Sequence, residues 1–132
     1  MRLAILDMGT NVFSLLIARV NEEGYEILDV EKIPSKIGEG GITKGVLTEE
    51  AFQSAANAME RVEEIIMRIG GVERRLAIAT SAVRGAANSS DFVKIAEGRG
   101  FSVEIIKGER EAELIYKGVR ESMLLYDEVF LI

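Results

Sequence analysis

Apolar and polar positions in the first quarter of the chain form three runs that are typical of β-strands. The runs cover Leu3–Leu6, Val12–Val20 and Tyr25–Ile33, and residues that favour turns separate them. Asn21–Gly24 is a hairpin connection, and Pro34 removes a backbone donor at the end of the third run. The pattern therefore predicts two consecutive hairpins.

The residues between Thr48 and Gly70 have the spacing of an α-helix. Thr48 is a good N-cap, and Gly70 with Gly71 is a typical helix stop. Because the apolar residues between them recur every three or four positions, they form one stripe that can face a core. The stripe consists of Phe52, Ala55, Ala56, Met59, Val62, Ile66 and Ile69.

The remaining sequence alternates strands and helices. A short buried strand is predicted over Leu76–Ala79, and a further strand over Phe101–Ile106. Between them, Asn88 and the two serines after it are predicted to cap a helix that ends near Glu97. A long helix is expected from Glu109 to about Leu125, before a last strand over Glu128–Ile132.

Two hairpins followed by alternating units predict an α/β fold with a mixed sheet and helices on both faces. This is the element order of the ribonuclease H-like fold, the half-domain that repeats in the actin, sugar-kinase and heat-shock-chaperone superfamily. Residues 1–126 would form one such subdomain. Residues 127–132 would be the first strand of a second subdomain, so we expect a fragment of a longer protein.

Composition narrows the chemistry. The chain has 132 residues, enough for one domain with a core, and contains neither Cys nor His. Disulfides, thiolate zinc sites, cysteine nucleophiles and histidine bases are thereby excluded from this sequence. A metal ion would need oxygen ligands, as Mg²⁺, Mn²⁺ and Ca²⁺ do, and a general base would be Asp, Glu, Lys or Tyr.

We expect a cytoplasmic protein, and its charge does not exclude a small basic pocket for an anionic substrate. The net charge of −6 argues against a broad nucleic-acid surface. The longest apolar stretch, Val12–Val20, is far shorter than the roughly 20 residues that span a bilayer. We expect no membrane contact and no nucleic-acid partner.

The turn after the first strand carries the clearest candidate chemistry. Gly9 can take a positive φ and let a ligand approach the backbone. The turn amides, the Thr10 hydroxyl and the Asn11 amide can all point at one anion, and Asp7 at the strand end can hold a hard cation over it. Because Gly, Asn and Asp also favour plain β-turns, the simpler interpretation stays open.

Glu111 heads an inward-turning stripe. It precedes Leu114, Ile115 and Gly118 by three, four and seven residues on a predicted helix, so its carboxylate could orient an attacking water. An acid in a first helical turn can instead simply complement the helix dipole.

Basic residues supply three further candidates. Arg84 follows a predicted strand end, where sites in such sheets lie, and arginine binds phosphate oxygens as a bidentate fork. Lys36 and Lys44 flank a glycine-rich stretch that we expect to be a mobile loop able to catch a polyanion. An ordinary exposed arginine and a solvated lysine loop are the alternatives.

Four motifs in order make the chain resemble the exopolyphosphatase and guanosine pentaphosphate phosphohydrolase family. The first turn, Asp7–Val12, resembles the family's Asp-x-Gly-Ser/Thr-Asn-Ser. Gly38–Gly41 followed by Gly45–Leu47 resembles its glycine loop. Thr80–Arg84 matches its Thr-x-x-x-Arg segment, and Gly108–Ile115 its Gly-x-Glu-Glu-Ala-x-Leu-Ile helix start.

The resemblance implies a Mg²⁺-dependent hydrolase that removes terminal phosphate from inorganic polyphosphate or a guanosine polyphosphate nucleotide. It implies that Glu111 is the base that activates water and that Arg84 contacts the terminal phosphate. Asp7 would help to position Mg²⁺, and the first phosphate cradle would consist of Gly9, Thr10 and Asn11. Two alternatives stay open. One is a ribonuclease H-like nuclease with Asp7 and Glu111 as metal carboxylates; the other is a non-catalytic regulator that binds an alarmone nucleotide.

The chain also departs from the family pattern. Val12 stands where a serine is usual, which removes one hydroxyl contact, and Arg110 replaces an acid beside Glu111. The family's second turn, Asp-x-Gly-Gly-Gly-Ser/Thr, would begin after Ile132. We therefore expect these residues alone to be inactive, with an unfinished sheet edge that can pair with a second copy.

Overall fold

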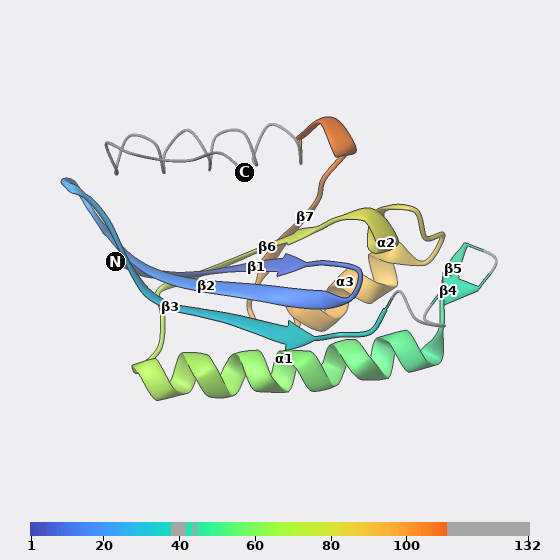
Figure 1. Ribbon diagram of the computed structural model, residues 1–132, viewed down its shortest axis with the longest axis horizontal. Helices are drawn as coiled ribbons and strands as arrows, with labels where there is room; N and C mark the ends of the chain where they lie inside the picture. The colour runs from blue at the N-terminus through green and yellow to red at the C-terminus, as the bar shows by residue number, and fades with distance from the viewer. Residues whose placement is uncertain (38–41, 44, 111–132) are drawn as a thin grey trace, which may run out of the picture.

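The computed structural model describes residues 1–37, 42–43 and 45–110. Five strands form one sheet in the order β3-β2-β1-β6-β7 (Figure 1). Their bounds are Arg2–Met8 for β1, Val12–Asn21 for β2, Gly24–Pro34 for β3, Arg74–Ala79 for β6 and Ser102–Ile105 for β7. The pairs β1–β2 and β2–β3 are antiparallel, whereas β1–β6 and β6–β7 are parallel. The predicted mixed sheet is confirmed, and the carboxyl ends of β1, β6 and β7 lie at one edge.

Three helices and a small hairpin complete the described part. They are α1 (Glu49–Ile69), α2 (Ser81–Arg84) and α3 (Ser89–Glu97), with β4 (Ile42–Thr43) paired antiparallel to β5 (Val46–Leu47). The β4–β5 pair lies in the stretch that was expected to be a mobile loop, where Gly45 takes a φ of 76° that suits a tight turn. The helix and strand predicted over 109–125 and 128–132 fall almost wholly outside the described residues.

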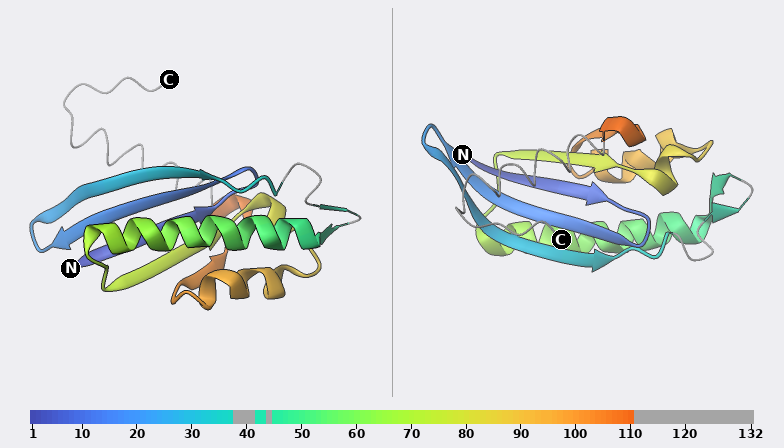
Figure 2. Two further views of the ribbon diagram at one scale, coloured as in Figure 1. Left: turned by 90° about the horizontal axis from the view of Figure 1, so that it is seen from below. Right: turned by 45° about the horizontal axis from the view of Figure 1, so that its top comes forward.

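The core lies between the sheet and the two longer helices. Alternate residues of β1 and β2 point to one face, and there Leu6, Met8, Phe13 and Leu15 are at most 1% exposed. The stripe of α1 packs onto this face. Phe52 of α1 stacks on Phe92 of α3 with ring centroids 5.3 Å apart, so α1 and α3 share one side of the sheet (Figure 2).

The ends of α1 follow the sequence signals. The Thr48 side chain accepts a hydrogen bond from the Ala51 amide at 3.1 Å. At the other end Gly70 has a φ of 98°, and the Gly71 amide donates to the Ile66 carbonyl at 2.9 Å. Both predicted caps are confirmed, and they fix where the chain enters and leaves the helix.

The opposite face of the sheet carries half-buried apolar side chains, among them Leu3, Ile5, Leu16, Leu76 and Ile78. A face of this composition requires cover in a folded protein. Within the described ranges, no helix combines the length and the apolar character needed to cross a membrane.

Candidate functional site

The predicted phosphate turn lies at the carboxyl end of β1. Met8 and Phe13 are the last cross-strand pair of β1 and β2, and residues 9–11 connect the two strands. Gly9 and Thr10 are half-buried and Asn11 is exposed. The turn therefore lies at the sheet edge where β6 also ends (Figure 1).

Gly9 is required for a different reason from the one predicted. Its backbone does not adopt a positive φ. Instead, a Cβ atom placed on Gly9 would lie 2.7 Å from the Val12 carbonyl oxygen. Glycine is required here because the backbone of the turn passes too close to the Val12 carbonyl to leave room for a side chain.

The end of β3 is fastened to this turn. The Asn11 carbonyl accepts hydrogen bonds from the Ser35 amide at 2.9 Å and the Lys36 amide at 3.1 Å. Lys36 is exposed and adopts a left-handed φ of 53°, which is uncommon for a residue with a side chain. The Ser35 hydroxyl is buried and has no hydrogen-bond partner among the described residues. The structure therefore brings Lys36 next to the turn, whereas Lys44 lies outside the described residues.

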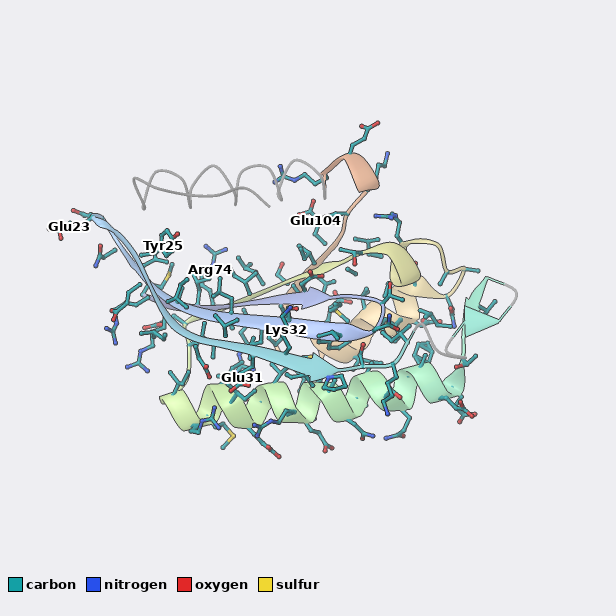
Figure 3. The ribbon with its side chains drawn as sticks, in the orientation of Figure 1. Glu23, Tyr25, Glu31, Lys32, Arg74 and Glu104 are labelled. Carbon is teal, nitrogen blue, oxygen red and sulfur yellow. The ribbon has the colours of Figure 1, made fainter. Side chains whose placement is uncertain are left out.

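Asp7 stands in a row of cross-strand neighbours that crosses the sheet and is polar except at Ile78. The register pairs Asp7 with Ser14 and Ser14 with Lys32. In the other direction it pairs Asp7 with Ile78 and Ile78 with Glu104. Paired residues point to the same face, which here is the face opposite α1; Lys32 and Glu104 mark the two ends of the row (Figure 3).

Ser14 and Lys32 were missed by the sequence analysis. A polar Ser14 inside an apolar strand was the only local signal, and its relation to Asp7 follows from strand register alone. Ser14 is half-buried on the Asp7 face.

The donor chemistry around Asp7 fits a loosely held magnesium ion. One oxygen of the Asp7 carboxylate, Oδ1, is buried. In the part of the chain that the structure describes, no three Asp, Glu, His or Cys side chains gather into a metal-binding group. Mg²⁺ is commonly held by one or two carboxylates together with water and substrate phosphates. Asp7 fits that arrangement, in which the protein supplies only part of the coordination shell.

Arg84 lies on α2, directly after β6, at the same edge of the sheet as the phosphate turn. Its Nη1 donates to the Ile106 carbonyl at 3.1 Å, and the Ile106 amide donates to the Ala79 carbonyl at 3.0 Å. The guanidinium is therefore held at the exit of β7. Ile106 is five residues before Glu111, which itself lies outside the described residues.

Of the predicted site, Asp7, Arg84 and the 9–11 turn come together at one sheet edge, and Lys36 is fastened to that turn. Charged pairs far from this sheet edge stabilise other parts of the fold. At the far end of β6, for example, the pKa of the Glu63 carboxyl is lowered by its hydrogen bond from Arg75, against a smaller raising effect of burial.

Comparisons with known proteins point to one family. The model of the Ppx/GppA phosphatase family matches residues 16–132. A putative exopolyphosphatase of Haemophilus influenzae is 30% identical over 96 residues, which cover 71% of this chain and 29% of the relative.

Solved structures show the same fold. An exopolyphosphatase from Cytophaga hutchinsonii superposes with a TM-score of 0.81 at 38% identity, over 92% of this chain and 39% of that one. The Aquifex aeolicus member of the Ppx/GppA family gives a TM-score of 0.71 at 28% identity, over 84% of this chain and 36% of its own. The chain thus spans 29% to 39% of these three proteins. With its motifs in order, its sheet topology and these matches in agreement, the chain belongs to the Ppx/GppA phosphatase family.

Proposed function

We propose that this chain is the N-terminal part of a Mg²⁺-dependent phosphohydrolase that releases terminal phosphate from inorganic polyphosphate or guanosine pentaphosphate. The observation that carries the proposal is the convergence of Asp7, the 9–11 turn and Arg84 at one edge of the sheet. Family membership supports the same reaction class.

The turn and Arg84 would bind phosphoryl oxygens. Backbone amides of the turn, with the Thr10 hydroxyl and the Asn11 amide, offer donors of the kind that cradle an anion. The bond from Arg84 to the Ile106 carbonyl fixes the guanidinium at 3.1 Å from that oxygen. Its planar fork suits phosphate oxygens, and its charge would balance the charge that develops during transfer.

Asp7 would hold the magnesium ion, whose contribution is to neutralise charge on the phosphate oxygens. Residues of this chain would activate the attacking water. Glu111 would accept a proton from water as the water oxygen forms a bond to the terminal phosphorus, and the bridging oxygen would leave with the remaining chain. The resemblance supplies the role of Glu111, and Arg84 places a cation at the strand end that leads to it.

The choice between polyphosphate and guanosine pentaphosphate would rest on parts of the protein beyond these residues, because one half-domain supplies only one side of a cleft. For the same reason residues 1–132 alone are expected to release little or no phosphate. Lys36, fastened to the turn through its amide at 3.1 Å, would contact a longer anionic chain.

The test is phosphate release by the complete gene product. We expect phosphate from polyphosphate, guanosine pentaphosphate or both in the presence of Mg²⁺, little after chelation by EDTA, and no cutting of single- or double-stranded RNA and DNA offered as controls. Mg²⁺-dependent cutting of nucleic acid without phosphate release would replace this proposal with a nuclease. Tight binding of the guanosine nucleotide without turnover would replace it with a regulator.

A further inference from the structure

Lys36 has a backbone conformation that is unfavourable for lysine. Among the described residues other than glycine, it alone has a positive φ, of 53°, and a left-handed residue with a Cβ atom is disfavoured relative to glycine. Packing imposes this conformation, because Ser35 before it and Ile37 after it are both 0% exposed. In addition, the amides of Ser35 and Lys36 both donate to the Asn11 carbonyl. The chain therefore turns at residue 36 whichever side chain it carries.

The fold does not use the Lys36 side chain. Lys36 is exposed, and its side chain forms no hydrogen bond or ion pair with the other described residues. The preceding residue departs from a second local rule, since the buried Ser35 hydroxyl has no hydrogen-bond partner in the described part of the chain. Departures from local rules that persist in a folded protein are expected at functional sites. A lysine where glycine would be favoured therefore indicates a use for its ammonium group.

Lys36 and Arg84 lie on opposite sides of the phosphate turn. Val12 pairs with Pro34 at the end of β3, so β3 ends at the same edge as β1 and β6 (Figure 1). Lys36 follows β3, Arg84 lies on α2 after β6, and the turn joins the two strands between them. Because neighbouring strands are about 4.8 Å apart, three strand spacings place the ends of β3 and β6 about 14 Å apart.

Arg84 is the cation on the side of the proposed general base. Its Nη1 donates to the Ile106 carbonyl at 3.1 Å, and Ile106 is five residues before Glu111 in the sequence. A phosphate that contacts both the 9–11 turn and Arg84 would therefore be the one attacked by water. The remainder of a linear substrate would then extend over the turn toward the end of β3.

We propose that a linear phosphate chain lies along this edge, with its terminal phosphate at Arg84 and the 9–11 turn and its inner phosphates at Lys36. The inference rests on the proposed function and adds to it the direction of the bound chain and a residue that selects long substrates. The three phosphates of tripolyphosphate are too few to reach from Arg84 to Lys36. A long chain gains a charged contact at Lys36, and a short substrate does not depend on it.

The experiment measures steady-state phosphate release by the complete gene product from long-chain polyphosphate and from tripolyphosphate. Since Lys36→Ala removes one charged contact, the KM for the long chain is expected to rise roughly tenfold. The kcat values and the KM for tripolyphosphate should change less than about twofold. Lys36→Arg keeps the charge and should retain the wild-type KM. Lys94→Ala is the matched control, because Lys94 is an exposed lysine of α3, and it is expected to behave as wild type.

Lys36→Gly separates the effect of the side chain from that of the backbone. Glycine relieves the left-handed strain that alanine retains, so the glycine variant is expected to melt at a higher temperature than Lys36→Ala. Both variants lose the ammonium group and should raise the KM for the long chain equally. A lysine that serves only the fold predicts instead that the glycine variant, which is the more stable of the two, has the lower KM.

Arg84→Ala tests the direction of the chain. It is expected to lower kcat on both substrates, because the terminal phosphate loses the same contact in the transition state whatever the chain length. The reverse pattern would be a fall in kcat on both substrates for Lys36→Ala and a higher KM for the long chain alone for Arg84→Ala. That pattern would show the chain bound in the opposite direction and would overturn the inference.

The outcomes separate the inference from the proposed function. If wild type hydrolyses both substrates and Lys36→Ala leaves the KM for the long chain unchanged, or raises both KM values equally, the inference is overturned and the function stands. The inference also fails alone if wild type releases phosphate from guanosine pentaphosphate but not from polyphosphate. If wild type releases no phosphate from any of these substrates, both fall together.

Discussion

Gly9 shows how the phosphate turn depends on one backbone approach. An added Cβ would meet the Val12 carbonyl oxygen at 2.7 Å, and because that oxygen belongs to the backbone it can move only if the turn moves. Asn11 of this turn accepts hydrogen bonds from the amides of Ser35 and Lys36. A shift at Gly9 would therefore also move Lys36.

Gly9→Ala is therefore expected to weaken substrate binding strongly. A shift of about 1 Å in the phosphate cradle predicts a loss of roughly 10²-fold in kcat/KM for polyphosphate, with a smaller effect on melting temperature. Steady-state phosphate release by the complete gene product measures it. Gly98→Ala is the control, because a Cβ there would lie 3.2 Å from Lys94 O, far along the chain from the turn; equal kcat/KM for both variants would contradict the argument.

At the residue scale, the sequence predicts those site residues that can be recognised from a short motif around them. Asp7, the 9–11 turn and Arg84 were recognisable because each belongs to a short motif at a strand end. Ser14 and Lys32 beside Asp7 were not, since their relation depends on strand register. The Asn88 side chain makes no cap hydrogen bond, contrary to the sequence expectation, and bonds instead to Leu47, 41 residues away.

At the scale of elements, an ion pair joins α1 to the sheet at the end opposite the phosphate turn. Arg75 of β6 donates Nη1 and Nη2 to the Glu63 carboxylate at 2.6 and 3.1 Å, and Nη1 also donates to the Arg99 carbonyl at 2.9 Å. The Arg75 guanidinium lies 5.9 Å from the centre of the Phe101 ring. One side chain thus links α1, β6 and the exit of α3.

Glu63→Gln tests this link through its pH dependence. The pKa of Glu63 is lowered, first by the hydrogen bond from Arg75, so its contribution to stability is present above the ordinary pKa of 4.5 and is lost as pH falls through the lowered value. We expect the variant to be destabilised by about 1 kcal/mol at neutral pH, with a difference that shrinks in acid. Melting temperatures at neutral and acidic pH measure it.

Glu64→Gln is the matched control, because Glu64 is the neighbouring residue and pairs with Arg61 while 67% exposed. It is expected to change the melting temperature little at any pH. A Glu63→Gln deficit that stays constant from neutral to acidic pH would show that packing rather than charge holds this corner.

The elements themselves were largely predictable. Strand alternation and the caps at Thr48 and Gly70 give the bounds of α1 and the first three strands to within a few residues, because these signals are local. The β4–β5 hairpin was expected to be loop. Two strands of two residues each are too short for a hydrophobic period to reveal them, and the hydrogen bonds between Asn88 and Leu47 of β5 join residues 41 positions apart.

At the scale of the whole molecule, the chain corresponds to part of larger proteins in its family, and we propose that it supplies one side of their binding cleft. It spans 39% of the Cytophaga hutchinsonii exopolyphosphatase and 36% of the Aquifex aeolicus family member. The element order predicted the mixed sheet and the edge at which the site residues meet. Glu111 lies outside the described residues, so its role stays a prediction.

Phosphate release by Glu111→Gln in the complete gene product tests the central claim most directly. Replacing a general base by a group that cannot take a proton is expected to lower kcat on polyphosphate by roughly 10²–10⁴-fold, with KM and melting temperature nearly unchanged. Glu109→Gln, an exposed glutamate two residues earlier, should retain wild-type turnover. Near-normal kcat in Glu111→Gln would contradict the account and remove Glu111 from the reaction.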